Sequence, residues 1–286
     1  MVILVTGGSG QLGQALQSIE RNYPSAVVHF ADSLKANISS KESLAHIFTT
    51  LKPHYCINAA AYTAVDKAES DIERAALINV TGAKNLAEIC NDFGTVLIHV
   101  STDFVFDGNR ESLVPYTEID LTNPQGVYGR TKRDGELEII KNLEKHYIVR
   151  TSWLYSEFGN NFMKTMLRLG GERDTLSIVN DQIGTPTHAV DLANAIMKII
   201  ADDYANKTAN YGIYHFSNEG KASWFDFADK IFKSNKVTIE VKPIPTSQFP
   251  TPAKRPAFSV LDKSKIKSTF EIEIDDWETA LNKKRK

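Results

Sequence analysis

Tyr128 and Lys132, in the run Tyr128-Gly129-Arg130-Thr131-Lys132, are residues whose types and spacing suit acid–base chemistry. Because they are four residues apart, they share one face of a helix. A tyrosine with its ordinary pKa near ~10 is a poor acid–base catalyst at neutral pH, but a neighbouring ammonium favours the phenolate and lowers that pKa. The pair could then give a proton to a carbonyl oxygen that is being reduced. The spacing alone is common by chance, and two exposed helix residues are the simpler interpretation.

A hydroxyl group is expected beside this pair. The apolar run Val96–Val100 predicts a strand, and it ends in Ser101-Thr102-Asp103. The Thr102 hydroxyl would therefore lie at the carboxyl edge of a sheet, where doubly wound folds bind ligands. We expect Thr102 to hydrogen-bond the substrate carbonyl, the alternative being a cap at the end of the strand.

A glycine-rich turn lies between the strand Val2–Val5 and a helix. Gly7 permits the tight turn, Gly10 lets backbone N–H groups approach a pyrophosphate, and Gly13 allows close packing of the helix. The N-terminus of that helix offers unpaired donors and the positive end of a dipole to the anion. An ordinary flexible turn is the alternative, but the position between one strand and one helix is the one that dinucleotide binding requires.

Two later segments could bind the parts of a dinucleotide that lie beyond the pyrophosphate. Asp32, just past the second expected strand, could accept hydrogen bonds from the adenosine ribose of NADH, whereas Lys35 could neutralise the 2′-phosphate of NADPH. The residues alone leave this choice open. A second wall of the cofactor site is expected where small side chains follow a strand, at Ala59, Ala60, Ala61, Tyr62 and Thr63.

The first 150 residues alternate between short apolar runs and helical patterns. The expected strands are Val2–Val5, Val27–Phe30, Tyr55–Asn58, Val96–Val100 and Tyr147–Val149. The expected helices are Leu12–Arg21, Lys41–Leu51, Asp71–Phe93 and Tyr128–Lys141, the third with a capping box formed by Ser70 and Glu73. Strands that are apolar on both faces and separated by helices predict an α/β fold of the Rossmann type, a doubly wound parallel sheet.

After Arg150 the pattern is less regular. Helices are expected at Phe162–Leu169, Val190–Ile200 and Trp224–Phe232, the last capped by Ser223, with strands at Leu176–Val179 and Ile213–Phe216. Prolines between Pro243 and Pro256 indicate extended loop. We therefore expect residues 1–150 to bind the dinucleotide and residues 151–286 to form mainly a smaller substrate-binding lobe, with some segments returning to the sheet.

Composition narrows the class of protein. With 33 basic and 35 acidic residues among 286, the net charge of −2 gives no sign of a nucleic-acid or membrane surface. No apolar stretch approaches the ~20 residues that cross a bilayer. The basic run Lys283–Lys286 is interpreted as a solvated chain end. Cys56 and Cys90 lie in apolar patterns and are expected as core thiols, a disulfide between them being the alternative, so we expect the cytoplasm.

Several segments resemble a known family. The spacing of Gly7, Gly10 and Gly13 resembles the extended short-chain dehydrogenase/reductases. Within that family, the chain is similar over its whole length to the dTDP-4-dehydrorhamnose reductases, at Asn58–Glu69, Ser101–Phe106, Tyr128–Lys132, Arg150–Trp153, Gly159–Phe162, Asp181–Thr187 and Pro250–Pro256. The resemblance implies reduction of the 4-keto group of a dTDP-6-deoxy-hexulose to dTDP-L-rhamnose, with NADPH or NADH.

The resemblance also implies which residues bind. Sugar contacts would come from Thr102, Asp103 and Trp153, whose flat indole suits the C–H groups of a deoxysugar. Arg168 and Arg255 are candidates for the substrate diphosphate or, equally, for surface salt bridges. Tyr128 and Lys132 are expected to contact the cofactor as well as to act in catalysis. Further cofactor contacts are implied at Gly10, Gln11, Leu12, Asn37, Ile38, Ala61, Tyr62 and Thr63.

Two departures from the family matter. Phe104 stands where we expect a tyrosine, which removes one hydroxyl near the site. Ala15 stands where some relatives carry a glutamate at a metal-bridged dimer interface, and the histidines show no ligand spacing, so no metal is expected. A monomer and a homodimer both stay open.

Three alternatives follow from the same fold. A nucleotide-sugar 4,6-dehydratase needs Asp-Glu directly after the active-site threonine, and Phe104 stands in place of that glutamate. A non-catalytic NADP-binding regulatory subunit, like the partner of methionine adenosyltransferase, is opposed by the presence of Thr102, Tyr128 and Lys132 together. Another nucleotide-sugar reductase or epimerase of the same family stays open.

Overall fold

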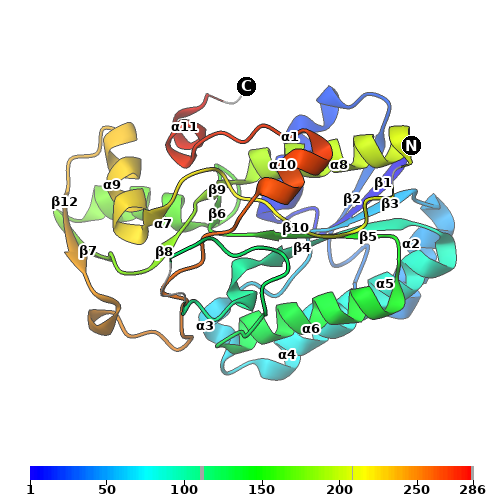
Figure 1. Cartoon of the computed structure of the whole chain (residues 1–286), viewed down its shortest axis with the longest axis horizontal. Coiled ribbons are helices and arrows are strands. Elements are labelled where there is room, and N and C mark those ends of the chain that lie inside the picture. Colours follow the sequence, from blue (N-terminus) through cyan, green and yellow to red (C-terminus); the bar gives the residue numbers. More distant parts are fainter. Residues whose placement is uncertain (110–112, 208, 285–286) are drawn as a thin grey trace.

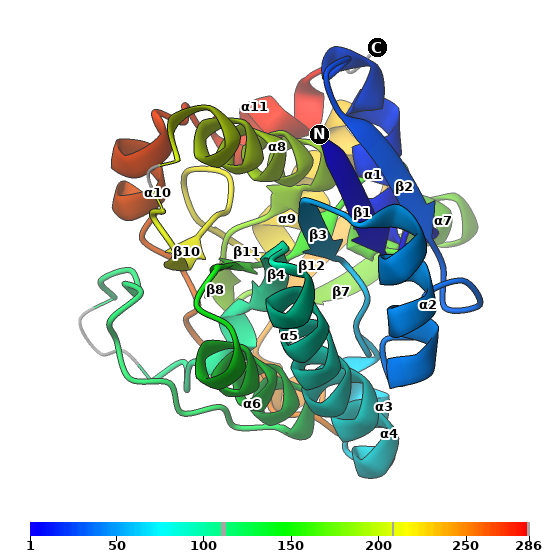
Figure 2. The same cartoon turned by 90° about the vertical axis from the view of Figure 1, so that its right-hand side faces the viewer.

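A central parallel sheet organises the computed structural model, which describes residues 1–109, 113–207 and 209–284. All its neighbouring strands pair in parallel (Figure 2). In spatial order the strands are β10 (Gly212–His215), β5 (His146–Thr151), β4 (Val96–Thr102), β3 (Tyr55–Asn58), β1 (Val2–Thr6) and β2 (Val27–Ala31). The expected doubly wound parallel sheet is confirmed.

Helices cover both faces of the sheet (Figure 1). On one face α1 (Gln11–Ile19) packs against α8 (Ala189–Asn206), over side chains such as Val5 and Ile57. On the other face the side chains of alternate strand residues, such as Leu4 and Cys56, pack under three helices. These are α2 (Lys41–Leu51), α5 (Gly82–Phe93) and α6 (Val127–Asn142).

The order of the strands reverses between β1 and β3. The chain leaves β1 for β2 on one side and then returns through α2 to β3 on the other side. At such a point the connections diverge, and the carboxyl ends of the strands border a crevice. The structure therefore opens its main cleft beside the ends of β1, β3 and β4.

The helix expected over Asp71–Phe93 is interrupted. It consists of α4 (Ile72–Ala76), a π-helical turn η2 (Leu77–Thr81) and α5. The expected capping box of Ser70 is wrong, because the helix begins at Ile72 and Ser70 instead bonds through its Oγ and backbone N–H to the carbonyl of Lys67, closing the short helix α3 (Val65–Ala68).

Some of the less regular residues after Arg150 form a separate apolar cluster, whereas α8 and β10 pack with the central sheet. In the separate cluster, α7 (Phe162–Glu172) packs on α9 (Trp224–Ser234), and β7 (Thr175–Val179) pairs with β12 (Glu240–Ile244). The expected cap at Ser223 is confirmed, with Asp226 completing a capping box. Pro243 lies inside β12 rather than in a loop, which this short two-stranded pairing tolerates.

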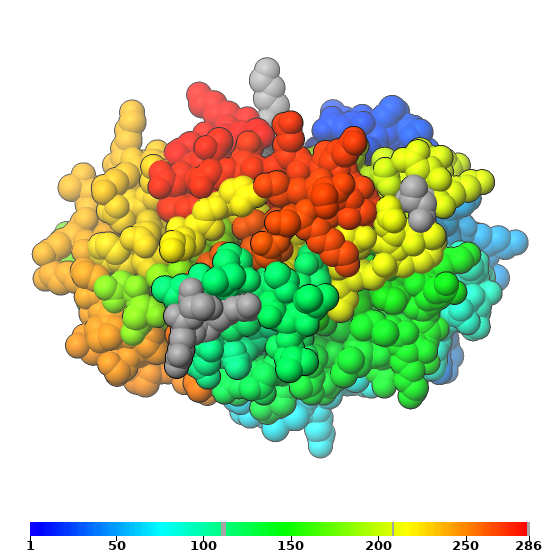
Figure 3. Space-filling view, in the orientation of Figure 1, coloured from blue at the N-terminus to red at the C-terminus, as the bar shows by residue number. Residues whose placement is uncertain are grey.

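Shorter elements complete the structure, and the C-terminal segments, orange and red, lie at the surface (Figure 3). They are η1 (Glu20–Asn22), η3 (Asp103–Val105), β6 (Leu154–Tyr155), β8 (Ile183–Gly184), β9 (Thr187–His188), β11 (Ala222–Ser223), η4 (Thr246–Gln248), α10 (Ser264–Phe270) and α11 (Trp277–Asn282).

Among the residues described, no helix combines the length and apolar character needed to cross a membrane. Cys56 and Cys90 are free, buried thiols that interact with each other, and burial raises the pKa of the Cys90 thiol. Of the basic run at the end of the chain, Lys283 pairs with Asp275, while Arg285 and Lys286 lie outside the described residues.

Candidate active site

A cavity of about 630 Å³ lies at the carboxyl ends of the central strands. Its walls combine the glycine turn, the segment after β3, the end of β4, α6 and the residues that follow β5. Both parts of the sequence thus face one space. Its lining includes Gly10, Gln11, Leu12, Ala59, Ala61, Thr63, Thr102, Asp103, Phe104, Tyr128, Lys132, Trp153, Trp224 and Arg255.

The glycine turn is packed too tightly for side chains at two of its positions. Gly7 has φ +71°, and a Cβ built on it would lie 2.6 Å from the Ala60 nitrogen. A Cβ on Gly13 would lie 2.4 Å from the Gly8 carbonyl oxygen. Gly10 precedes the first turn of α1 and lines the cavity, so the N-terminus of this helix faces the space. This is a cradle that only glycine can form.

The residues after β2 form a compact turn outside the cavity lining. The Asp32 carboxylate accepts the backbone N–H groups of Leu34 and Lys35, each at 3.1 Å. Asn37 accepts the N–H of Ser39, and Ile38 is buried. Lys35 is exposed. The structure places this turn next to the glycine cradle, since the Gly8 N–H donates to the carbonyl of Ala31.

An asparagine that the sequence did not single out holds the wall after β3. Asn79, in the π-helical turn, accepts the Tyr62 N–H at 2.8 Å and donates to the Tyr62 carbonyl and to Thr131 Oγ1. Its side chain is buried, and it ties this wall to α6. An asparagine within an otherwise apolar helical pattern was the only signal in the sequence. Ala59, Ala61 and Thr63 line the cavity.

Tyr128 lies at the cavity wall with its ring against Phe104, in an edge contact 5.6 Å between ring centroids. Although the ring is partly open to the cavity, burial raises the pKa of Tyr128 to about 12, and a contact with the Thr102 hydroxyl only partly offsets this. The expectation of a lowered Tyr128 pKa is therefore wrong for the protein without ligands, because loss of hydration on burial raises this pKa.

Lys132 is directed into the sheet instead. Its Nζ lies 2.8 Å from the Val100 carbonyl oxygen and 3.1 Å from His99 Nε2, and its side chain is only 2% exposed. Burial lowers the pKa of Lys132 to about 8, with Glu136 acting in the opposite direction.

Thr102 and Asp103 end β4 beside Tyr128. Thr102 Oγ1 donates to Asp103 Oδ1 at 3.1 Å and accepts the N–H of Phe104, so it also caps η3. Asp103 Oδ2 is buried with no hydrogen-bond partner among the described residues, although Ser259 lies close enough to favour the carboxylate. Burial raises the pKa of Asp103 to about 6.

Trp153 forms one wall in a strained backbone conformation, with φ +45°. Its indole stacks on Trp224 with ring centroids 3.5 Å apart, and a Cβ on Gly184 would strike it. A non-glycine residue held in this region indicates a conformation imposed by its surroundings. The sequence did not single out Trp224, because its place in the cavity arises only from this stacking.

The two candidate arginines lie in different environments. Arg255 lines the cavity, where it forms a two-point ion pair with Asp66 at 2.7 and 2.9 Å and holds the pKa of that carboxyl below its usual value. The structure does not bring Arg168 to the cavity, because it is exposed on α7 and pairs with Glu172.

Gln11 joins the glycine turn to the second part of the chain. Its side chain donates to the Leu154 carbonyl and accepts from Asn161 Nδ2 at 2.7 Å. The first turn of α1 and the segment after β5 are thus held in register across the cavity.

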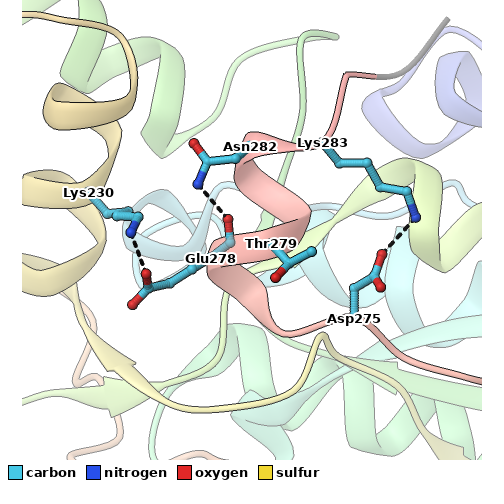
Figure 4. A pocket seen from close by; sticks show the side chains of 6 residues that line it. All are labelled: Lys230, Asp275, Glu278, Thr279, Asn282 and Lys283. Atoms are coloured by element: carbon cyan, nitrogen blue, oxygen red, sulfur yellow. Dashed lines mark hydrogen bonds and ion pairs between the residues drawn. The ribbon is translucent and has the colours of Figure 1, made fainter.

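A second hollow lies at the surface between α9 and α11 (Figure 4). Its charged side chains pair with each other, Lys230 with Glu278 and Lys283 with Asp275. It gathers none of the expected site residues.

Comparison with known sequences agrees with this geometry. The family model for the RmlD substrate binding domain matches residues 1–285. A dTDP-4-dehydrorhamnose reductase of Aggregatibacter actinomycetemcomitans is 42% identical over 98% of this chain and 96% of that protein. One of Salmonella typhimurium is 40% identical over 99% of this chain and 96% of that protein.

Solved structures give the same answer. The crystal structure of a dTDP-4-dehydrorhamnose reductase of Clostridium acetobutylicum has a TM-score of 0.92 and 41% identity, covering 99% of this chain and 97% of that one. That of Bacillus anthracis, in complex with NADP, has a TM-score of 0.92 and 38% identity, covering 98% and 96%. The resemblance expected from the sequence is confirmed, and the chain belongs to the RmlD family of dTDP-4-dehydrorhamnose reductases.

Proposed function

We propose that this protein reduces the 4-keto group of dTDP-4-dehydro-6-deoxy-L-mannose to dTDP-L-rhamnose. The observation that carries the proposal is the meeting of Thr102, Tyr128 and Lys132 in one cavity with the glycine turn, in a chain that matches this family over its whole length. NADPH, when bound, supplies the hydride, and NADH stays possible as a second donor.

The glycine turn fits a dinucleotide. At Gly7 and Gly13 a Cβ would strike backbone atoms, and the first turn of α1 directs its unpaired N–H groups toward the cavity. We assign the pyrophosphate to Gly10, Gln11 and Leu12. We assign the adenosine end to the turn from Asp32 to Ile38, and the nicotinamide end to the wall that follows β3.

Tyr128 is suited to give a proton rather than to take one. With a pKa raised to about 12, its phenol is protonated at neutral pH. The oxygen left by hydride addition to a ketone is an alkoxide, a stronger base than phenolate, so transfer from Tyr128 is favourable. Thr102, in contact with the phenol, would hydrogen-bond the same carbonyl oxygen and stabilise the charge that develops there.

The opposite wall suits a deoxysugar nucleotide. The stacked indoles of Trp153 and Trp224 offer a flat apolar surface, and Asp103 lines the same cavity, where its carboxyl could bind a sugar hydroxyl. Arg255 could receive the diphosphate if it exchanged its partner Asp66. We keep Arg168 only as a remote candidate, because it would have to leave Glu172 and reach the cavity.

The same proposal covers the organisation of the chain. Residues 1–150 supply the cofactor side of the cavity, and residues 151–286 supply Trp153, Trp224 and Arg255 on the substrate side. The free thiols of Cys56 and Cys90 favour a reducing compartment, the cytoplasm. A monomer and a homodimer are both compatible with this account.

Turnover of the keto-sugar nucleotide tests the function. We expect the purified protein to oxidise NADPH when dTDP-4-dehydro-6-deoxy-L-mannose is added and to release dTDP-L-rhamnose, identified by mass and NMR. Cofactor binding without turnover would contradict the proposal and favour a regulatory NADP-binding subunit. Turnover with a different nucleotide sugar only would favour another reductase of the fold.

A further inference from the structure

The first turn of α6 begins without a cap of its own. The residue that precedes the helix is Gly126, which has no side chain to accept a hydrogen bond. Helices usually begin after Ser, Thr, Asp or Asn, whose side chain accepts one of the unpaired N–H groups of the first turn. Tyr128, the proposed proton donor, is the second residue of this helix. The place of its phenol therefore depends on what holds this turn.

A side chain from another element takes the place of the missing cap. Glu69 Oε1 accepts the backbone N–H of Val127, the first residue of α6, at 2.7 Å. Glu69 directly follows α3 and lies 58 residues earlier in the chain than Val127. The positive end of the helix dipole also favours a carboxylate at this position.

The fit around Gly126 shows how closely the carboxylate is placed. Gly126 has φ −128°, a value that any residue adopts, so the backbone conformation does not require glycine here. A Cβ built on Gly126 would lie 2.7 Å from Glu69 Oε1, whereas the next atoms, Glu69 Cδ and the Lys254 carbonyl oxygen, would lie 3.9 and 4.0 Å away. The Glu69 carboxylate thus occupies the space that a side chain at position 126 would need.

The short helix α3 is itself fixed on both sides of Glu69's attachment. Ala68 is fully buried and packs with Val127 in one apolar cluster. Asp66, on the same helix, forms the ion pair with Arg255. Glu69 therefore reaches α6 from an element that is held in place, not from a free loop.

The other side of the same turn is also in close contact. A Cβ on Gly129 would lie 2.3 Å from the Phe104 carbonyl oxygen. Tyr128 lies between Val127 and Gly129 in the chain, with its ring against Phe104 and partly buried beside the cluster that contains Val127. Two contacts, one with Glu69 and one with Phe104, thus determine where this turn lies.

We propose that Glu69 is a positioning residue, which holds the first turn of α6 and thereby keeps the Tyr128 phenol beside Thr102. Glu69 is not among the residues that line the cavity, so it acts through the helix and not on the substrate. The inference rests on the proposed function, because the place of the phenol matters through the proton that it gives.

Amide hydrogen exchange tests the contact without cofactor or substrate. In Glu69→Ala the Val127 N–H loses its acceptor, so we expect the segment 126–134 to exchange faster than in the wild type. Glu69→Gln keeps a carbonyl oxygen at the same reach and should exchange like the wild type. Glu69→Asp keeps the charge but is one methylene shorter, and it should behave like Glu69→Ala. Unchanged exchange in Glu69→Ala would overturn the proposal.

Steady-state kinetics test the consequence for the reaction. We expect kcat for reduction to fall by about 10–100-fold in Glu69→Ala, because the proton donor is displaced, while KM for the keto-sugar nucleotide changes by less than about twofold. Glu69→Gln should restore most of kcat. A loss of affinity at unchanged kcat, or no recovery in Glu69→Gln, would contradict the positioning role.

Asp276→Ala is the matched control. It removes another carboxylate cap, which accepts the N–H of Glu278 at 2.9 Å in the first turn of α11. No residue of α11 is among the described residues that line the cavity, so kcat should stay the same. An equal fall of kcat in this variant would mean that any lost cap lowers the activity, which would contradict a specific role of Glu69.

A double variant tests whether Gly126 and Glu69 act through one contact. Gly126→Ala needs the space of the carboxylate, so it should displace Glu69 and lower kcat about as much as Glu69→Ala does. With Glu69→Ala already present that space is free, and adding Gly126→Ala should cause little further loss. Losses that multiply would contradict the shared contact. A wild type that does not turn over the keto sugar would contradict the proposed function, and hydrogen exchange would then still decide whether Glu69 holds α6.

Discussion

Gly13 and Gly171 both lie within helices, but their surroundings differ in the space for a methyl group. A Cβ at Gly13 would lie 2.4 Å from the Gly8 carbonyl oxygen, whereas a Cβ at Gly171 would meet nothing within 4 Å. We expect Gly13→Ala to lower the free energy of unfolding by about 1–3 kcal/mol and to weaken NADPH binding, because the turn must shift. Chemical denaturation and a cofactor titration measure the two effects.

Gly171→Ala is the matched control. With no clash, the added methyl group should raise the free energy of unfolding by about 0.4–1 kcal/mol and leave NADPH affinity unchanged. Equal behaviour of the two variants would mean that Gly13 is not needed for the shape of the cradle.

The raised pKa of the Asp103 carboxyl makes the free energy of unfolding depend on pH. Its pKa is about 6 in the folded protein and ordinary in the unfolded chain, so the folded state holds the proton more tightly. The stability that this provides is present below the unfolded pKa and is lost as pH rises through about 6. We expect the free energy of unfolding of Asp103→Asn, relative to the wild type, to increase by on the order of 3 kcal/mol between about pH 4 and pH 8.

Urea denaturation of both proteins across this pH range measures the difference in their free energies of unfolding. Burying the new amide adds the same amount to this difference at every pH, so it does not affect the predicted change. A difference that stays level with pH would show that Asp103 ionises with an ordinary pKa.

At the scale of elements, α6 is held to the sheet by a buried ion pair. Arg150 on β5 donates to both oxygens of Glu136 on α6, and Ser101 on β4 donates to the same carboxylate. Because Tyr128, Lys132 and Glu136 are successively four residues apart, this anchor fixes the helix face that carries the proposed catalytic pair.

Removing one partner leaves a buried charge without compensation. We expect Arg150→Met to lower the free energy of unfolding by about 3–5 kcal/mol. Arg168→Met, which breaks the exposed pair with Glu172, should cost about 0–1 kcal/mol. Thermal or urea unfolding of both variants compares them, and similar losses would contradict the anchoring role of Arg150.

The helices and strands could be predicted from the sequence where the spacing of apolar residues defines them. The strands Val2–Thr6 and Tyr55–Asn58 are apolar on both faces, and that pattern indicated a covered parallel sheet. The π-helical turn at Leu77–Thr81 was not predictable, because it follows from Asn79 bonding to Tyr62 and Thr131 rather than from any local preference. The error at Ser70 has the same origin, since the serine closes one helix instead of opening the next.

At the scale of the whole molecule, the sequence identified the groups that face the cavity but not how they act on each other. Tyr128 and Lys132 were recognised by their spacing, yet the direction of their pKa shifts depends on burial under β4 and α6. Trp224 and His99 carried no motif. Each gains its place from a partner distant in the sequence, Trp153 in one case and Lys132 in the other.

The central claim is that Tyr128 gives the proton in a reduction carried out in this cavity. Tyr128→Phe removes one hydroxyl and keeps the ring against Phe104, so the fold and the cofactor cradle should be preserved. The direct measurement is kcat for reduction of the keto-sugar nucleotide beside the Kd for NADPH, in wild type and variant. We predict that kcat falls by about 10²–10⁴-fold while the Kd stays the same. A variant that keeps full kcat would contradict the account.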